Sequence, residues 1–276
     1  MGSPARPVTG MPVALTIAGS DSGGGAGIQA DLKTFFALGC HGTSAVTALT
    51  AQNTVGVTAI HEVPVGVVIA QIDAVVTDIG VAAAKTGMLA SAPIVSAVAD
   101  AVRRHGIEQL VVDPVFVSKH RDTLLAGDAV DALKQELFPL AAVITPNLFE
   151  ASGLAGWEVQ TLDDAERAAK ELHALGPRAV LVKGGHLVDQ ADLAIDVLYD
   201  GHRVTHLEGP RFDTDDTHGT GCALSAAIAA RLAHGDSIEV AVRAAKEFVS
   251  GAIEQGLRLG QGYGPVNPGW RGTIGR

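Results

Sequence analysis

The sequence predicts an α/β fold, a three-layer α/β/α sandwich in which helices cover both faces of a mostly parallel central sheet. Short runs rich in β-branched residues alternate with longer helical patterns, which is typical of such sheets. The runs are apolar almost throughout, as strands buried on both faces must be. Asp200 and Gly201 separate two further runs and form a strong hairpin signal, so we expect one edge of the sheet to be antiparallel.

The individual elements follow from these patterns in chain order. The predicted strands cover residues 13–18, 42–49, 57–63, 81–85, 109–113, 141–145, 179–183, 193–199 and 202–207. After the loop 19–25, a helix carries Ile28, Leu32, Phe35 and Phe36 on one face. Further helices are predicted over residues 65–76, 129–138, 162–175, 219–234 and 237–259.

Length and composition favour a single domain. The chain has 276 residues, of which 47% are hydrophobic and 18% charged, enough for one large core. We expect the domain to span residues 11–276. Residues 1–10 are rich in Pro and Gly and lack the apolar segment of a secretory signal, so we expect a disordered tail.

Charge and cysteine content narrow the function classes. The 20 Lys and Arg residues against 30 Asp and Glu residues give a net charge of −10, which argues against binding to nucleic acid or to an anionic membrane surface. Polar residues interrupt every apolar run before the ~20 residues that a membrane span needs. Cys40 and Cys222 lie far apart and form no disulfide framework, so we expect a cytoplasmic protein.

A glycine loop before a predicted helix carries the strongest functional signal. Residues 216–222 read Asp-Thr-His-Gly-Thr-Gly-Cys, and a run of small residues follows. Gly219 and Gly221 let consecutive backbone N–H groups point at one anion, and the helix dipole favours phosphate there. Cys222 lies in the first helical turn, where a thiolate is stabilised. The loop therefore indicates phosphoryl transfer, against the alternative of a tight connection only.

The loop after the first strand is also rich in glycine. Its glycines do not fit the G-x-G-x-x-G pattern, because Ile28 occupies the last required position, and no Gly-Lys-Ser/Thr follows. The loop is either a flexible turn or a place where the backbone approaches a small planar ligand. In parallel sheets ligands bind beyond the carboxyl ends of the strands, so the polar residues that follow each strand are the candidates.

Several segments together resemble one family. They cover residues 15–19, 24–33, 47–54, 85–89, 113–115, 145–147, 183–186 and 217–222. Over residues 13 to 255 the chain resembles the hydroxymethylpyrimidine/phosphomethylpyrimidine kinases of thiamine biosynthesis, which belong to the ribokinase-like superfamily. The resemblance implies a ribokinase-like fold and transfer of the γ-phosphoryl group of ATP to a primary alcohol.

The resemblance also implies a substrate site. Gln52 would recognise the edge of an aminopyrimidine, since an amide offers a donor and an acceptor; alternatively it caps the end of a strand. The backbone at Gly19 and Ala26 would approach the ring, and Met88 and Val115 would cover it, although a lone Met is often part of the core.

The implied nucleotide site uses other strand ends. Asn147 and Glu150 form an N-x-x-E motif that would organise Mg²⁺ and phosphate through water, as Mg²⁺ commonly does; Asn147 alternatively caps the next helix. Lys183 would meet the triphosphate or reach out to solvent. Asp113 would serve the phosphate and metal region, with Glu150 and through water, or cap a turn. Thr217 would contact the nucleotide.

The base is left open between two residues. The amides of Gly219, Thr220 and Gly221 would stabilise the transferring group, with Lys183. Cys222 would take the hydroxyl proton if the helix end lowers its pKa. Asp31, placed by the resemblance near the hydroxymethyl end, is the competing base, unless it lies on the solvent face of its helix.

Alternatives and departures from the family pattern complete the expectations. A pyridoxal or pyridoxine kinase would use the same scaffold, and a catalytically silent pyrimidine-binding protein is a further alternative. A homodimer is possible. Asp216 stands where an asparagine is usual, which either weakens nucleotide binding or attracts Mg²⁺, and Phe116 replaces a usual methionine.

Overall fold

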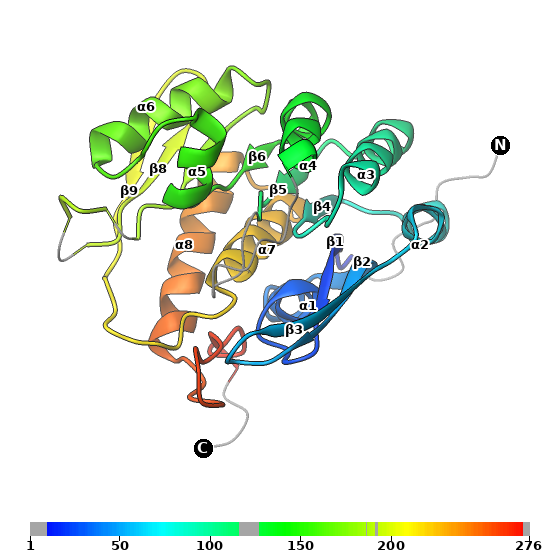
Figure 1. Ribbon diagram of the computed structural model, residues 1–276, viewed down its shortest axis with the longest axis horizontal. Coiled ribbons are helices and arrows are strands. Elements are labelled where there is room, and N and C mark those ends of the chain that lie inside the picture. Colours follow the sequence, from blue (N-terminus) through cyan, green and yellow to red (C-terminus); the bar gives the residue numbers. More distant parts are fainter. Residues whose placement is uncertain (1–9, 116–126, 186, 191–192, 273–276) are drawn as a thin grey trace.

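The computed structural model describes residues 10–115, 127–185, 187–190 and 193–272. Within these ranges nine strands form one sheet. Their bounds are β1 (Val13–Asp21), β2 (His41–Gln52), β3 (Val57–Glu62), β4 (Ala83–Thr86), β5 (Leu110–Val112), β6 (Val143–Ile144), β7 (Val180–Val182), β8 (Asp196–Tyr199) and β9 (Val204–Leu207). The order across the sheet is β3-β2-β1-β4-β5-β6-β7-β8-β9 (Figure 1). Every predicted strand is therefore present, within a few residues of its predicted ends.

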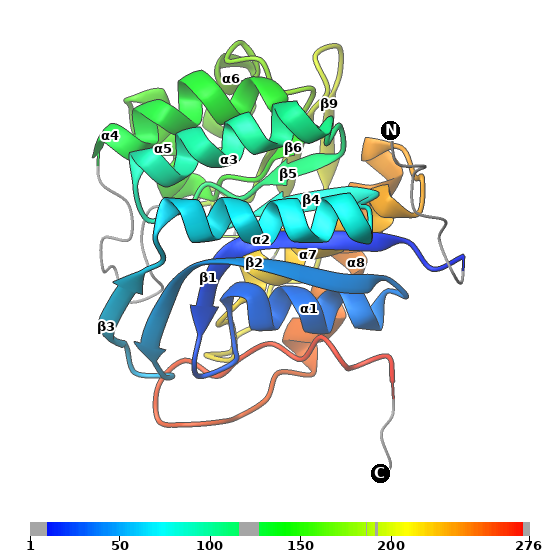
Figure 2. The ribbon, with the colours of Figure 1, turned by 90° about the vertical axis from the view of Figure 1, so that its right-hand side faces the viewer.

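Helices cover both faces of the sheet, as predicted. One face packs against α2 (Val65–Asp78), α3 (Ala92–His105), α4 (Gly127–Ala132), α5 (Leu148–Ala155) and α6 (Leu162–His173). The other face packs against α1 (Gly27–Ala37), α7 (Thr220–Ala233) and α8 (Ile238–Glu254). Figure 2 shows β1 and β2 side by side, with α1 and α2 flanking them on opposite sides. Short π and 3-10 turns, Leu133–Leu137 and Phe138–Leu140, follow α4.

The central strands β2-β1-β4-β5-β6-β7, in their order across the sheet, pair in parallel, and the strands at both edges are antiparallel. β8 and β9 form the predicted hairpin edge, and β7 pairs with β8 in the antiparallel sense. The second antiparallel edge, β2 with β3, was not predicted. Parallel pairing brings the carboxyl ends of these central strands to one side of the molecule. The candidate residues lie at these strand ends.

Two local predictions are wrong. Phe35 is fully buried in α1, but Phe36 is 85% exposed, because the buried stripe of this short helix runs through Ile28 and Phe35 and leaves the neighbouring position outside. The last predicted helix was extended to residue 259, but α8 ends at Glu254, and a glycine-rich segment follows. The buried cysteine Cys40 is an ordinary core side chain whose thiol donates to the carbonyl oxygen of Ala230.

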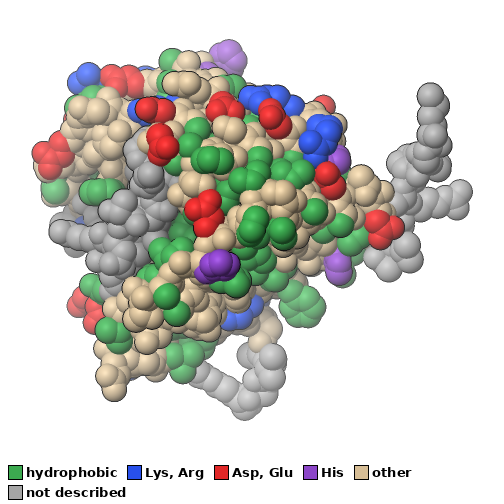
Figure 3. Space-filling model, turned by 45° about the vertical axis from the view of Figure 1, so that its right-hand side comes forward, with side chains coloured by type: hydrophobic (Ala, Val, Ile, Leu, Met, Phe, Trp, Pro, Cys, Tyr) green, Lys and Arg blue, Asp and Glu red, His purple; other side chains and the backbone are tan. Residues whose placement is uncertain are grey.

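The surface carries both apolar and charged areas. On the face shown in Figure 3, hydrophobic side chains gather near the centre and many charged side chains lie above them. Ile60 of β3 and Val67 of α2 are among the exposed large hydrophobic residues. None of the helices in the described ranges has the length and apolarity needed to cross a membrane. Residues 1–9, which make up most of the predicted tail, and Phe116 lie outside the described residues.

Candidate active site

Asp21 holds the glycine loop after β1 in shape. Its Oδ1 accepts the backbone N–H of Gly23 at 2.8 Å, and its Oδ2 accepts those of Gly25 at 3.0 Å and Ala26 at 2.8 Å. Burial acts to raise the pKa of Asp21, but the hydrogen bonds from His218 and from these N–H groups outweigh it and lower the pKa. The loop is therefore an ordered structure built around one carboxylate, and not a flexible turn.

Met88 lies against the backbone at Gly19. A Cβ atom at Gly19 would stand 2.6 Å from the terminal methyl group of Met88, so a larger residue there would displace the end of this side chain. The hydroxyl of Thr47 donates to the carbonyl oxygen of Met88 at 2.6 Å and fixes its backbone. Met88 is half-buried, so part of its side chain remains on the surface beside the predicted ring site. Ala26 lies at the start of α1, just before Gly27.

Gln52 is the last residue of β2 and lies beside the glycine loop that follows β1. Its backbone N–H donates to Oγ of Ser22, and the Ser22 hydroxyl donates back to its carbonyl oxygen, both at 2.8 Å. Because Ser22 satisfies the backbone at this strand end, the side-chain amide is not needed as a cap. The amide instead lies between Thr50 and His218, at 3.0 Å and 3.4 Å.

The first turn of α7 is open toward the strand ends. Gly219 precedes the helix with φ of 80°, and no side chain caps the N–H groups of this turn. A Cβ atom at Gly219 would overlap the carbonyl oxygen of Gly25, so the two glycine loops touch. The Thr220 hydroxyl donates to the carbonyl oxygen of Thr217 at 2.8 Å. The backbone N–H of Thr220 donates to the carbonyl oxygen of Thr217 at 3.3 Å, so the donors left at this positive helix end are those of its neighbours, as an anion site requires.

Lys183 joins that helix end to two buried carboxyl groups. Its Nζ lies 2.9 Å from Asp113 and 3.8 Å from Glu150, and it would stand 3.2 Å from a Cβ atom at Gly221. Burial opposes both charges of the Lys183 and Asp113 pair, but their attraction raises the pKa of Lys183 and lowers that of Asp113. Burial raises the pKa of Glu150 to about 7, against the effect of Lys183. Lys183 is thus not directed to solvent.

Asn147 and Glu150 form a capping box at the start of α5. The Asn147 side chain accepts the N–H of Glu150 at 2.8 Å, and Glu150 Oε2 accepts the N–H of Asn147 at 2.7 Å. The capping alternative for Asn147 is therefore present in the structure. Glu150 Oε2 also faces Lys183, so the same carboxyl group serves the helix end and the site.

The two carboxyl groups fit a magnesium ion shared with a nucleotide. Among the described residues, no three His, Cys, Asp or Glu side chains converge as a complete metal site. Mg²⁺ is commonly held by one or two carboxylates together with substrate phosphates and several waters. Asp113 and Glu150, close to one ammonium group and to the open helix end, provide that smaller set.

Cys222 lies between the beginnings of two helices. The backbone N–H of Gly27, the first residue of α1, donates to its sulfur, and Cys222 itself lies in the first turn of α7. Burial nevertheless raises the pKa of the thiol to about 11. The pKa of Cys222 is therefore not lowered in the way a base at neutral pH would need, and at neutral pH the thiol carries its proton.

Asp31 does not lie on a solvent face, so that alternative is wrong. Its side chain is fully buried, with Lys85 Nζ 2.9 Å from Oδ2 and the Thr16 hydroxyl donating to the same oxygen at 2.6 Å. Burial raises the pKa of Asp31, and these two partners oppose the rise. As a base, Asp31 would act from within this ion pair.

The remaining predicted residues have clear positions. Val115 is half-buried, and its N–H donates to the carbonyl oxygen of Asp113. Thr217 begins the loop before α7 and donates its N–H to Asp215. Asp216 packs against Gly256 and Gly264 and faces Arg258 at 3.9 Å, so its carboxylate is directed to the segment after α8.

Three contributors were missed by the sequence interpretation. Lys85 ends a strand of alanines as the only charged residue, a signal that could have indicated a buried pair. Asp21 is followed by three glycines within four positions, which suits a side chain that caps a turn. His218 contacts both Asp21 and Gln52, and its place in the glycine motif was the available signal.

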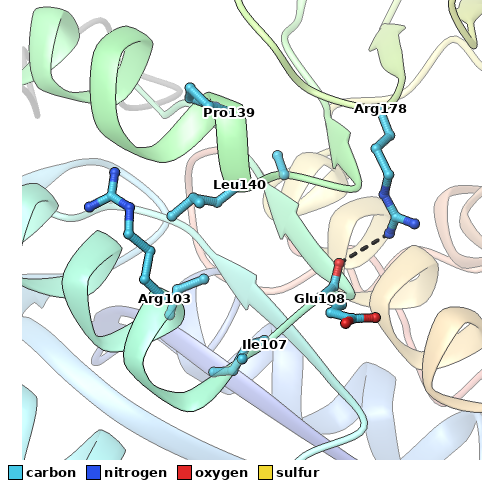
Figure 4. A pocket seen from close by; sticks show the side chains of 9 residues that line it. Arg103, Ile107, Glu108, Pro139, Leu140 and Arg178 are labelled. Carbon is cyan, nitrogen blue, oxygen red and sulfur yellow. Dashed lines mark hydrogen bonds between the residues drawn. The ribbon is translucent and has the colours of Figure 1, made fainter.

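A separate pocket of about 360 Å³ lies away from this site (Figure 4). Arg103, Ile107, Leu140 and Arg178 are among its lining residues, and the Arg178 guanidinium donates to the carbonyl oxygen of Glu108 at 3.0 Å. These residues lie before β5, β6 and β7, at the opposite end of the strands from the glycine loops. The pocket therefore does not belong to the candidate active site.

The sheet, its helices and the open end of α7 beside Lys183 define a ribokinase-like phosphotransferase. A family model described as phosphomethylpyrimidine kinase matches residues 21–267, and the chain belongs to this family. The hydroxymethylpyrimidine/phosphomethylpyrimidine kinase of Streptomyces coelicolor is 54% identical over 270 residues, which cover 98% of each chain. These findings confirm the resemblance stated from the sequence.

Solved structures of two relatives share the fold. Pyridoxal kinase from Bacillus subtilis, in complex with ADP, has a TM-score of 0.88 and 43% identity, covering 95% of this chain and 98% of its own. Phosphomethylpyrimidine kinase from Clostridium difficile has a TM-score of 0.78 and 42% identity, covering 88% of this chain and 99% of its own. The ribokinase-like fold predicted through the resemblance is therefore confirmed.

Proposed function

We propose that this protein transfers the γ-phosphoryl group of ATP to 4-amino-5-hydroxymethyl-2-methylpyrimidine and then to its monophosphate, giving the pyrophosphate for thiamine biosynthesis. The family match and the name of the Streptomyces coelicolor relative support the substrate. One observation carries the proposal. The start of α7 lies close to both halves of the proposed site: His218, just before the helix, contacts Gln52, and Gly221, in its first turn, lies next to Lys183. A phosphate acceptor and donor can thus meet at one helix end.

In the proposed reaction the protein mainly positions and neutralises. The N–H groups of Gly219, Thr220 and Gly221 donate to the transferring phosphoryl group, and Lys183 offsets its charge. Asp113 and Glu150 would hold Mg²⁺ through water, where the ion would supply further charge neutralisation. The substrate hydroxyl loses its proton to Asp31 or to the small thiolate fraction of Cys222.

Gln52, Gly19, Ala26, Met88 and Val115 form the proposed ring site. Gln52 offers its amide to the polar edge of the pyrimidine, and the backbone at Gly19 and Ala26 lies against the ring face. Met88 lies over Gly19 already, which supports its role as a cover. We further propose that Asn147 and Thr217 help to hold the nucleotide.

A pyridoxal kinase activity is the second candidate. It is favoured by the Bacillus subtilis pyridoxal kinase, whose structure is similar over 95% of this chain. The decisive assay measures ATP-dependent phosphorylation of the pyrimidine alcohol, its monophosphate and pyridoxine side by side, with and without Mg²⁺. Product from pyridoxine alone would contradict the first proposal.

Three further points concern catalysis, location and oligomeric state. An enzyme should turn over ATP and lose this turnover in Lys183→Ala. A silent pyrimidine-binding protein should bind its ligand and show no turnover even in the unaltered chain. We place the reaction in the cytoplasm, in line with the two free thiols. A possible homodimer is tested by light scattering of the full chain.

A further inference from the structure

His218 is held rigidly between the two glycine loops. It is only 8% exposed. Its backbone N–H donates to the carbonyl oxygen of Gly264 at 2.9 Å, and its backbone carbonyl oxygen accepts the N–H of Val266 at 3.1 Å. On the other side, a Cβ atom at Gly25 would stand 2.5 Å from the imidazole ring. The ring therefore has little freedom to move.

The contact with Asp21 decides which ring nitrogen carries a proton. Nε2 of His218 lies 3.2 Å from Oδ2 of Asp21. This carboxyl group also accepts N–H groups from Gly23, Gly25 and Ala26, which favours its ionised form. An ionised carboxylate can only accept, so Nε2 of His218 must donate, whether the ring is neutral or charged.

Thr50 contacts the other end of the Gln52 amide. In the structure, Nε2 of this amide lies 3.4 Å from Nε2 of His218, and Oε1 lies 3.0 Å from Oγ1 of Thr50. The Thr50 hydroxyl can donate its single proton to Oε1 or to the carbonyl oxygen of Ser20 at 2.9 Å, and in the second case Oγ1 is an acceptor for the amide.

The His218 contact requires one orientation of the Gln52 amide. With the amide nitrogen toward His218, as in the structure, two N–H donors face each other. With the amide rotated by half a turn, its oxygen accepts from Nε2 of His218, and its nitrogen donates to Oγ1 of Thr50, whose proton then goes to Ser20. His218 therefore selects this rotated orientation, and Thr50 accommodates it.

We propose that His218 is a positioning residue which fixes the Gln52 amide, so that the site prefers a ring edge with an amino donor beside a ring-nitrogen acceptor. This inference rests on the proposed role of Gln52 in substrate binding. After His218 and Thr50 are bound, one N–H and one lone pair of the amide remain, in a fixed order. An aminopyrimidine edge matches only one order, whereas the hydroxyl group of a pyridoxine-type ring both donates and accepts and matches either.

The test compares two alcohols in two variants of His218. His218→Leu removes the Nε2 donor, and His218→Gln keeps an N–H donor at a similar reach. We expect His218→Leu to lower the ratio of kcat/KM for the pyrimidine alcohol over that for pyridoxine by about tenfold, the value of one hydrogen bond. The loss should fall mainly on the KM of the pyrimidine, and His218→Gln should restore the ratio.

His234→Leu is the matched control. His234 follows the far end of α7 and contacts the carbonyl oxygen of Leu38, so this variant should leave the ratio unchanged. An unchanged ratio in a folded His218→Leu, or an equal loss for both alcohols, would overturn the inference.

A second measurement does not depend on turnover. The ¹⁵N–¹H spectrum of the unaltered protein should show a proton on Nε2 of His218, and a bare Nε2 would overturn the inference even if His218→Leu fails to fold. If the unaltered protein phosphorylates neither the pyrimidine alcohol nor its monophosphate, the proposed function fails while the spectrum still decides the position of the proton. The two failures are therefore distinguishable.

Discussion

At the scale of single residues, Glu150 is a buried carboxyl group whose pKa is raised to about 7. A raised pKa means that the folded protein prefers the protonated form, so this contribution to stability is complete below pH 4.5 and is lost as the pH rises through about 7. Glu150→Gln removes the charge and keeps a side chain suited to the capping box. We expect equal stability at pH 5 and, at pH 8, a variant more stable by up to about 3 kcal/mol.

Urea unfolding at the two pH values measures this difference, and ATP turnover of the same variant should fall. Glu247→Gln, an exposed position on α8, is the control and should change neither quantity. A Glu150→Gln variant that is less stable at pH 8 than the unaltered chain would show that the carboxylate is stabilising, contrary to this reasoning.

Cys222 gives a second prediction at this scale. Because the pKa of its thiol is about 11, the thiolate fraction at neutral pH is small and grows about tenfold with each pH unit. If Cys222 takes the hydroxyl proton, kcat should keep rising between pH 7 and pH 9, and Cys222→Ala should lower it by about a hundredfold or more. A flat profile in the unaltered enzyme would instead favour Asp31.

At the scale of elements, the two glycines at the start of α7 have different roles. Gly219 needs its positive φ and its contact with Gly25, so Gly219→Ala should destabilise the fold. Gly221 lies within the helix, and a Cβ atom there would meet the flexible end of Lys183 at 3.2 Å and Oδ2 of Asp113 at 3.7 Å, an ordinary contact distance. Gly221→Ala should therefore keep or raise the melting temperature, since Ala stabilises helices by about 1 kcal/mol relative to Gly.

The same Gly221→Ala variant should lose ATP turnover by about tenfold or more, because the Lys183 ammonium must move. Thermal unfolding and steady-state kinetics on both variants check the contrast. Loss of stability in Gly221→Ala, or full activity with an unchanged KM for ATP, would contradict the assigned place of Lys183.

Elements were predictable where the pattern is local. Most of the nine strands follow from β-branched runs, β4 from the alanines that follow Val81, and the hairpin of β8 and β9 from Asp200 and Gly201. The antiparallel pairing of β2 with β3 was missed because the turn 53–56 lacks an Asn-Gly or Asp-Gly pair in its centre. Phe36 could not be told from Phe35, since both suit an apolar helical face.

At the scale of the whole molecule, the site depends on contacts between distant segments. The resemblance and the strand ends indicated Lys183, Asp113 and Glu150, and parallel pairing does bring them together. The Asp31 pair with Lys85 joins residues 54 positions apart, and no local pattern specifies it. Burial, which raises the pKa of Cys222, likewise depends on the complete fold.

Because the proposed nucleotide site joins β5, β6, β7 and α7, binding there should stabilise the entire fold. Mg²⁺ and ATP at about a hundred times the dissociation constant should add about 2.7 kcal/mol, a rise in melting temperature of roughly 5–10 °C. Asp113→Asn should reduce this rise, because it weakens the proposed magnesium site next to Lys183. Lys246→Met, which removes an ion pair with Asp196 elsewhere in the fold, should lower the starting temperature and leave the rise intact. Thermal unfolding with and without Mg²⁺ measures each case, and an equal rise from ATP alone would contradict a role for the two carboxyl groups in holding the ion.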